Sequence, residues 1–202
     1  MVGPVTNWLR TLYLWMLQWA DSPLGTWALF FIAFAEASFF PLPPDILLLA
    51  LGFSTPLRSF YFATLTTLGS VTGAVVGYAI GFWFWDVTAD LFYTWVPGFT
   101  PLLFQQMQDN FIQYGFWIVF TAGFTPIPYK IITIGAGVFA LNVPIFLLAS
   151  IVSRGMRFFM LAALMYFYGE QARIFTERHF NKLSIAFCVL LVGGFALIRY
   201  AF

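Results

Sequence analysis

Two arginines lie near the middle of a long apolar stretch, where charged side chains are rare. Arg154 and Arg157 are three residues apart within residues 144–168, so a helix places them on one face. Ionisable groups at membrane depth are expensive and usually mark a functional site. Guanidinium groups match phosphate oxygens, and together with Lys130 the two arginines are predicted to bind an anionic phosphate headgroup. The alternative is that both arginines only pair with buried acids.

Two carboxylates in an earlier apolar stretch are the candidate proton carriers. Glu36 lies nine residues before Asp45 on the other side of a proline-rich break, so the two groups are predicted to converge across a turn. A carboxyl group that is buried or placed beside another can exchange a proton near neutral pH, which makes both residues candidates for proton coupling. The alternative for Glu36 is a carboxylate that caps the amide groups of a half-helix.

Prolines interrupt two apolar stretches, residues 24–53 and 116–141. A straight helix does not run through such clusters, because proline lacks an N–H donor and clashes with the preceding turn. Irregular backbone at membrane depth persists only where protein or water satisfies it. We therefore predict two re-entrant helical hairpins, broken at Pro41, Pro43 and Pro44 in the first and at Pro126 and Pro128 in the second.

The two hairpins align without gaps at an offset of 85 residues. Five identities fall within the 14 positions of residues 39–52, which is more than these diverse residue types would give by chance. The same offset places Asp45 on Lys130. These opposite charges are predicted to meet near the membrane midplane, the alternative being a purely structural ion pair.

One long helix is predicted after each hairpin, over residues 60–85 and 144–168. The first carries a glycine at every fourth position, which forms a stripe along one face and lets another helix approach closely. The alternative for this stripe is a smooth track for a lipid tail. Its members are Gly69, Gly73, Gly77 and Gly81.

These elements combine into an all-α integral membrane protein with one membrane domain, residues 1–202. Two hairpins that each return to their own side, each followed by a crossing helix, have opposite orientations, as in the inverted repeats of secondary transporters. Repeat 1 spans residues 24–85 and repeat 2 residues 116–168. The predicted remainder is an interfacial N-terminal helix (1–22), an interfacial connector (86–113) and a C-terminal transmembrane helix (183–202).

Composition excludes several other classes of protein. With 61% hydrophobic and 8% charged residues, the chain does not match a soluble domain, and a net charge of +1 offers no basic surface for nucleic acid. Cys188 is the single cysteine and His179 the single histidine, so neither an internal disulfide nor a multi-histidine metal site is expected. No enzyme motif appears, and we predict no enzymatic activity, no cofactor and no metal.

Four stretches of the chain together resemble the DedA family of bacterial membrane proteins, also called the SNARE-associated or VTT-domain family, and its shorter YqaA-like branch in particular. They are EASFFPLPPD (residues 36–45), the glycine-rich run 69–81, FTPIPYK (124–130) and SRGMRF (153–158). The resemblance implies opposed re-entrant hairpins and proton-linked movement of lipids such as undecaprenyl phosphate or phospholipids, with the family acids at Glu36 and Asp45. Many members carry two arginines around the second hairpin proline, where this chain has Gly123 and Lys130.

Residues and resemblance lead to one functional hypothesis, a proton-linked flippase or scramblase of lipid phosphates in the bacterial inner membrane that supports envelope homeostasis. The predicted partners are anionic lipids and protons, with a homo-oligomer left open. Two alternatives remain: a non-transporting scaffold that binds a partner helix through the glycine stripe, and a transporter of small ions.

Overall fold

The computed structural model describes residues 24–40, 43–96, 100–125 and 127–169, and its regular elements are all helices. They are α2 (Gly25–Ser38), α3 (Pro44–Ser54), the 3-10 turn η1 (Pro56–Arg58), α4 (Ser59–Trp95), α5 (Pro101–Phe124), α6 (Tyr129–Val138) and the helix Val143–Gly169. The predicted helices at residues 1–22 and 183–202, together with Pro41, Pro126, His179 and Cys188, lie outside the described residues.

Both predicted breaks interrupt their helices where the prolines stand. α2 ends at Ser38, and α3 begins at Pro44 after an extended Pro43 (φ −70°, ψ 117°). α5 ends at Phe124, and α6 begins directly after Pro128. Proline suits the first position of a helix, because the N–H that it lacks has no partner inside the helix there. The second arms of the two hairpins therefore begin at matching positions of the 85-residue repeat.

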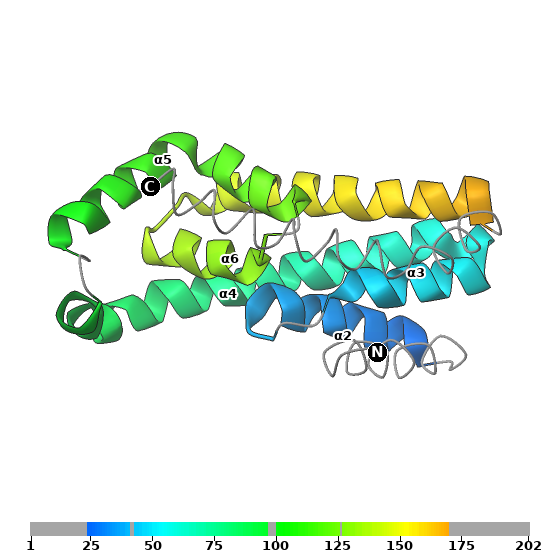
Figure 1. Ribbon diagram of the computed structural model, residues 1–202, viewed down its shortest axis with the longest axis horizontal. Coiled ribbons are helices and arrows are strands. Elements are labelled where there is room, and N and C mark those ends of the chain that lie inside the picture. The colour runs from blue at the N-terminus through cyan, green and yellow to red at the C-terminus, as the bar shows by residue number, and fades with distance from the viewer. Residues whose placement is uncertain (1–23, 41–42, 97–99, 126, 170–202) are drawn as a thin grey trace, which may run out of the picture.

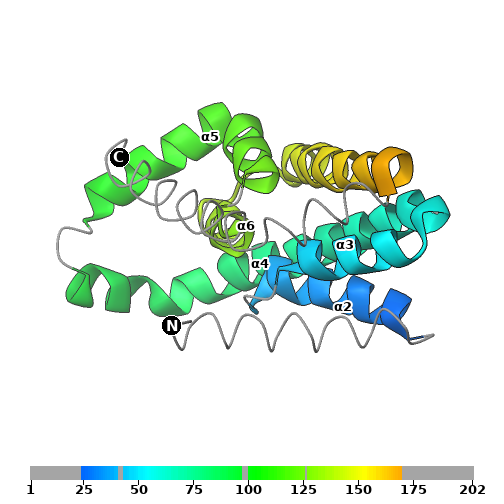
Figure 2. The same ribbon diagram turned by 45° about the vertical axis from the view of Figure 1, so that its right-hand side comes forward.

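The two hairpins enter the molecule from opposite ends. Figure 1 shows α2 running toward the centre and α3 returning to the end from which α2 came, while α5 and α6 do the same from the other end. The rotated view in Figure 2 keeps α3 and α6 on opposite sides of the centre. The breaks therefore point toward one another, with α4 and the helix Val143–Gly169 running past both.

α4 is longer than predicted, because the aspartates that follow residue 85 do not end the helix. It was expected to stop at residue 85, but it continues to Trp95, and α5 begins at Pro101 instead of residue 116. Asp86 and Asp90 are exposed and four residues apart, so they share a face of α4 without interrupting its backbone. The helix ends only before Pro97, and Thr100 then caps α5 by accepting a hydrogen bond from the Leu103 amide (3.2 Å). Most of the expected connector is thus helical.

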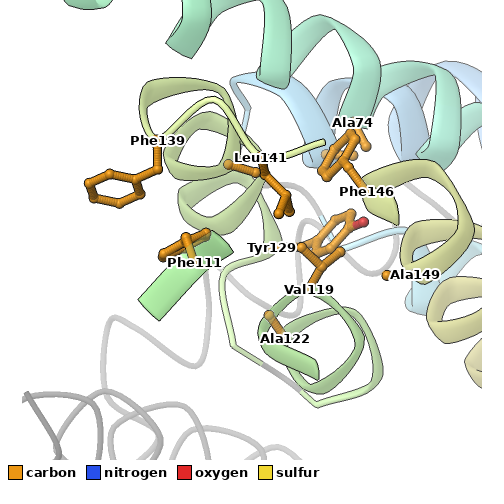
Figure 3. Close-up of a cluster of buried hydrophobic side chains, with 11 residues drawn as sticks. Ala74, Phe111, Val119, Ala122, Tyr129, Phe139, Leu141, Phe146 and Ala149 are labelled. Carbon is orange, nitrogen blue, oxygen red and sulfur yellow. The ribbon is translucent and has the colours of Figure 1, made fainter. Parts of the chain in front are cut away.

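The segment Pro56–Trp95 and the helix Val143–Gly169 are long and apolar enough to cross a membrane by length and composition. The second agrees closely with the predicted residues 144–168. Buried apolar side chains gather in two clusters beside these helices. One cluster surrounds the α2–α3 hairpin and includes Leu47 and Phe158. The other surrounds the α5–α6 hairpin, and Figure 3 shows its members, among them Val119 and Phe146.

The glycine stripe of α4 packs against helices of the same chain. A Cβ atom at Gly69 or Gly73 would overlap with the carbonyl oxygen of Phe30 or Phe34 in α2. The residue numbers of the contacting positions increase together in the two helices, so α2 and α4 run parallel. Their separation is one that only glycine permits. All four glycines of the stripe are buried, which contradicts the alternative of a lipid-facing track.

The stripe also carries the second hairpin. A Cβ atom at Gly77 would lie 3.1 Å from the carbonyl oxygen of Ala37 in α2 and 3.0 Å from the Cβ atom of Thr133 in α6. Farther along, one at Gly81 would overlap with the backbone of Ile134 in α6. α2 and α6 therefore follow one another along a single face of α4, and their meeting point is Gly77.

We expect Ala140→Gly to stabilise the protein by about 0.5–1 kcal/mol, because Ala140 adopts a left-handed backbone (φ 52°) in the turn after α6. Its side chain is exposed, so the substitution removes strain without a loss of packing. The melting temperature in detergent should rise. Ala163→Gly, inside the helix Val143–Gly169, is the control and should lower stability by about 1 kcal/mol. A fall of the melting temperature in both variants would contradict the prediction.

Candidate functional site

Four charged side chains form two ion pairs where the hairpin breaks meet. Glu36, in the last turn of α2, pairs with Arg154, and Asp45, in the first turn of α3, pairs with Arg157. The second pair is bidentate, with Nη2 to Oδ2 at 2.6 Å and Nε to Oδ1 at 3.2 Å. The pairs are neighbours, since Asp45 and Arg157 are close enough to act electrostatically on Glu36. Each pair joins the first hairpin to the long helix of the second repeat.

Arg154 is enclosed on all sides by the fold. Its Nε donates to the hydroxyl of Ser70 in α4 (2.7 Å), and its guanidinium carbon lies 4.8 Å from the ring centres of both Tyr129 and Phe158. Tyr129 is in turn fixed by a hydrogen bond to Ser150 (2.6 Å). Figure 3 shows the Tyr129 hydroxyl directed toward the helix that also carries Ala149. The Arg154 side chain thus has partners in α2, α4 and α6.

Arg157 connects the first hairpin to the break of the second. Besides Asp45, its Nη1 donates to the carbonyl oxygens of Thr125 (2.9 Å) and Phe124 (3.4 Å), which end α5. One guanidinium group therefore touches both breaks. A second link is the hydroxyl of Thr133 in α6, which donates to the carbonyl oxygen of Ala37 in α2 (2.9 Å).

The observed pairing corrects one prediction directly. Asp45 pairs with Arg157 rather than with Lys130, although the repeat alignment makes Asp45 and Lys130 equivalent. Lys130 is half-buried, and its ammonium group has no hydrogen bond or ion pair among the residues that the structure describes. No observed contact joins Lys130 to either arginine. The alternative in which Arg154 and Arg157 pair with Glu36 and Asp45 is the arrangement that the structure contains.

Comparison with protein families places this site within a known domain. A model of the VTT domain matches residues 42–167. The chain belongs to the VTT-domain family. The match includes Asp45, Lys130, Arg154 and Arg157, whereas Glu36 lies just before it.

The VTT-domain protein has relatives of almost the same length. An uncharacterized protein of Haemophilus influenzae is 33% identical over 94% of this chain and 97% of its own, and one of Histophilus somni is 36% identical over 90% and 95%. No solved structure matches the chain. The family establishes a VTT-domain membrane protein, and these relatives add no activity to it.

Sequence reasoning missed the neutral residues that hold the arginines. Ser70, Tyr129 and Phe158 surround Arg154, and the carbonyl oxygens at the end of α5 receive Arg157. A signal was present for Ser70, a polar residue directly after a stripe glycine in an apolar helix, where hydroxyl groups commonly bond to a neighbouring helix. Tyr129 offered another signal, since a buried tyrosine needs a hydrogen-bond partner for its hydroxyl group. Carbonyl oxygens exposed by a helix break carry no sequence signal.

An arginine that is paired with a carboxylate in this way can also bind other anions. The guanidinium fork that donates to two carboxylate oxygens can also donate to two phosphate oxygens, so an anionic ligand can compete with the internal acid. Breaking such a pair without a substitute is unfavourable, since it leaves an uncompensated buried charge. Replacement of the acid by another anion would therefore cost less free energy than simple opening of the pair.

Proposed function

We infer that this VTT-domain protein is a proton-linked flippase or scramblase of lipids with phosphate headgroups in the bacterial inner membrane, and not an enzyme. The observation that carries the proposal is the pair of arginines on a membrane-length helix, each held by a carboxylate at the meeting point of two helix breaks. Broken helices at a repeat interface are where secondary transporters bind their substrates. Undecaprenyl phosphate and phospholipids fit the required chemistry.

The ion pairs supply a way to link proton and lipid. Proton uptake by a carboxylate of the site removes its negative charge and frees the arginine's hydrogen-bond donors, which then bind the phosphate. When the phosphate leaves, the carboxylate releases the proton and pairs with the arginine again. The arginine keeps an anionic partner in both states, so no bare charge is left at membrane depth.

Opposed hairpins would allow the site to be reached from either side of the membrane. We expect Thr55, after α3, and Asn142, after α6, to lie on opposite sides, because the hairpins return to opposite ends of the molecule. Both side chains are exposed. In cells carrying single cysteines at these positions, an impermeant thiol reagent should label only one of them.

This labelling requires a protein in which Cys188 is replaced by Ser. The same Cys188→Ser protein without an introduced cysteine is the control. Permeabilised cells should label both positions, which shows that each thiol reacts. Labelling of both from the same side of intact cells would rule out the inverted arrangement.

A flipping assay tests the function itself. Purified protein in phosphatidylcholine vesicles should move a fluorescently labelled phosphatidic acid between leaflets, and a proton gradient should change the rate. Labelled phosphatidylcholine, whose headgroup has no net charge, should move more slowly. If vesicles with and without the protein moved the lipid at the same rate, lipid transport would be refuted. An ion flux that requires the protein would then point to the small-ion alternative.

The scaffold alternative is weakened in the form predicted from the sequence. The glycine stripe that was to receive a partner helix is covered by α2 and α6 of the same chain.

A further inference from the structure

We propose that the two ion pairs have different tasks. Arg154 and Glu36 form a permanent joint between the repeats, while Arg157 and Asp45 form the pair that opens to receive the phosphate. The inference rests on the proposed function and assigns the exchange to one pair of the site.

Enclosure distinguishes the two arginines. The side chain of Arg154 is 3% exposed, whereas that of Arg157 is 15% exposed, so Arg157 is the more accessible of the two to a phosphate. The rings of Tyr129 and Phe158 stand on Arg154 at 4.8 Å, and cation–π contacts of this kind strengthen where water is excluded. A lipid headgroup could approach Arg154 only by displacing these rings.

The backbone next to Glu36 is also held in place. Ala37 and Ser38 are fully buried, and the Ala37 carbonyl oxygen accepts the hydrogen bond from Thr133 of the other hairpin. Gly73 presses the preceding turn of α2 against α4, where a side chain would collide with Phe34. Glu36 thus extends from a segment fixed by α4 and α6, and its pairing with Arg154 completes a rigid joint.

Arg157 has adaptable partners. Its donors are divided between the Asp45 carboxylate and the carbonyl oxygens that end α5, so it keeps the Thr125 contact if Asp45 withdraws. Lys130 follows the same break, and its ammonium group has no partner among the described residues. Without the Asp45 carboxylate, Arg157 and Lys130 would be two cations at the break between α5 and α6 that a phosphate could bind.

Loss of the Asp45 contact from Arg157 would be the switching event. Among the residues that the structure describes, the charged groups around Asp45 are Arg157 on the helix Val143–Gly169, in direct contact, and Glu36 on α2, with Arg154 beyond it. A neutral side chain at position 45 is a poor partner for Arg157, so removing its charge should favour phosphate binding at this pair. The charge of Glu36 stays neutralised by Arg154 throughout.

The test is the pH profile of flipping, measured with the full chain in vesicles that contain labelled phosphatidic acid. Wild-type protein should move the lipid at rates that differ between acidic and alkaline pH, as the proposed function requires. Asp45→Asn should abolish this difference, because the neutral amide resembles the protonated acid. Glu36→Gln should lower the melting temperature while the folded fraction keeps its pH transition. Arg157→Lys should raise the lipid concentration for half-maximal rate about tenfold, since the bidentate fork is lost.

Ser70→Ala is the matched control on the Arg154 side. It removes the acceptor of the Arg154 Nε hydrogen bond, so the melting temperature should fall while the pH profile and the half-maximal lipid concentration stay as in wild type. This variant keeps the inference testable if Glu36→Gln does not fold. Inorganic phosphate distinguishes the source of the anion, because uptake of phosphate into the vesicles without movement of the labelled lipid would indicate a carrier of free phosphate.

The outcomes separate the two proposals. A wild-type protein that moves no lipid refutes the proposed function, and the division of tasks falls with it. Wild-type flipping that depends on pH, combined with a pH transition lost in Ser70→Ala or Glu36→Gln, overturns the division alone. The same holds if Asp45→Asn retains the wild-type transition.

Discussion

Arg154→Gln is expected to lower the free energy of unfolding by about 3–5 kcal/mol, the range observed when one partner of a buried ion pair is removed. The substitution leaves Glu36 without its counter-charge at a site where the arginine is 3% exposed. It also removes the cation between the rings of Tyr129 and Phe158. Thermal unfolding in detergent, without added lipid, measures the effect.

The double variant Glu36→Gln with Arg154→Gln separates charge from packing. Two neutral amides leave no buried charge unpaired, and neutral replacements of a buried pair are often tolerated. Most of the lost stability should therefore return. A double variant as unstable as Arg154→Gln would show that Arg154 acts through its packing, and the joint would then not depend on Glu36.

Gly73→Ala is expected to destabilise the protein by about 1–3 kcal/mol, although alanine is the better helix former, because the added methyl group overlaps with the backbone of α2 at Phe34. A backbone carbonyl group cannot rotate away as a flexible side chain can. α2 would have to separate from α4, which also moves Glu36 at the end of α2. The melting temperature in detergent should fall.

Gly155→Ala is the matched control, on the helix Val143–Gly169. Its added Cβ atom would have the Cγ2 atom of Thr67 as its nearest neighbour, at 3.9 Å, which is an ordinary contact. Here the helix propensity of alanine decides, and we expect stabilisation by up to about 1 kcal/mol. The two variants should therefore differ in sign. Destabilisation by both, to a similar degree, would mean that close α2–α4 packing is not the cause.

Local chemistry determined much of the fold in advance. The helix breaks at Pro43, Pro44 and Pro128 follow from the missing N–H of proline, and the stripe beginning at Gly69 follows from the need for close helix approach. The four acidic and basic residues at the site could be selected because charge in an apolar stretch is rare. Each of these inferences depends on a residue and its immediate neighbours.

The polar residues after residue 85 were a misleading guide to the end of α4. The aspartates of residues 86–90 suggested that the helix had ended, yet polar residues on an exposed face do not break a helix. The next helix breaker, Pro97, was the better guide to the boundary. Hydropathy thus indicated which residues are apolar, while the backbone chemistry determined where the helix stopped.

Only the tertiary structure decided which acid meets which base. Glu36 and Arg154 are 118 residues apart in the chain, and Asp45 and Arg157 are 112 apart. The repeat alignment favoured Asp45 with Lys130, but equivalent positions of a two-fold arrangement touch only near its axis, and elsewhere each position contacts a different one in the other repeat. Pairing therefore depends on how the hairpins are seated along the two long helices. That seating is set by the stripe glycines, which bring α2 and α6 to Gly77, and by the many contacts that no single residue reveals.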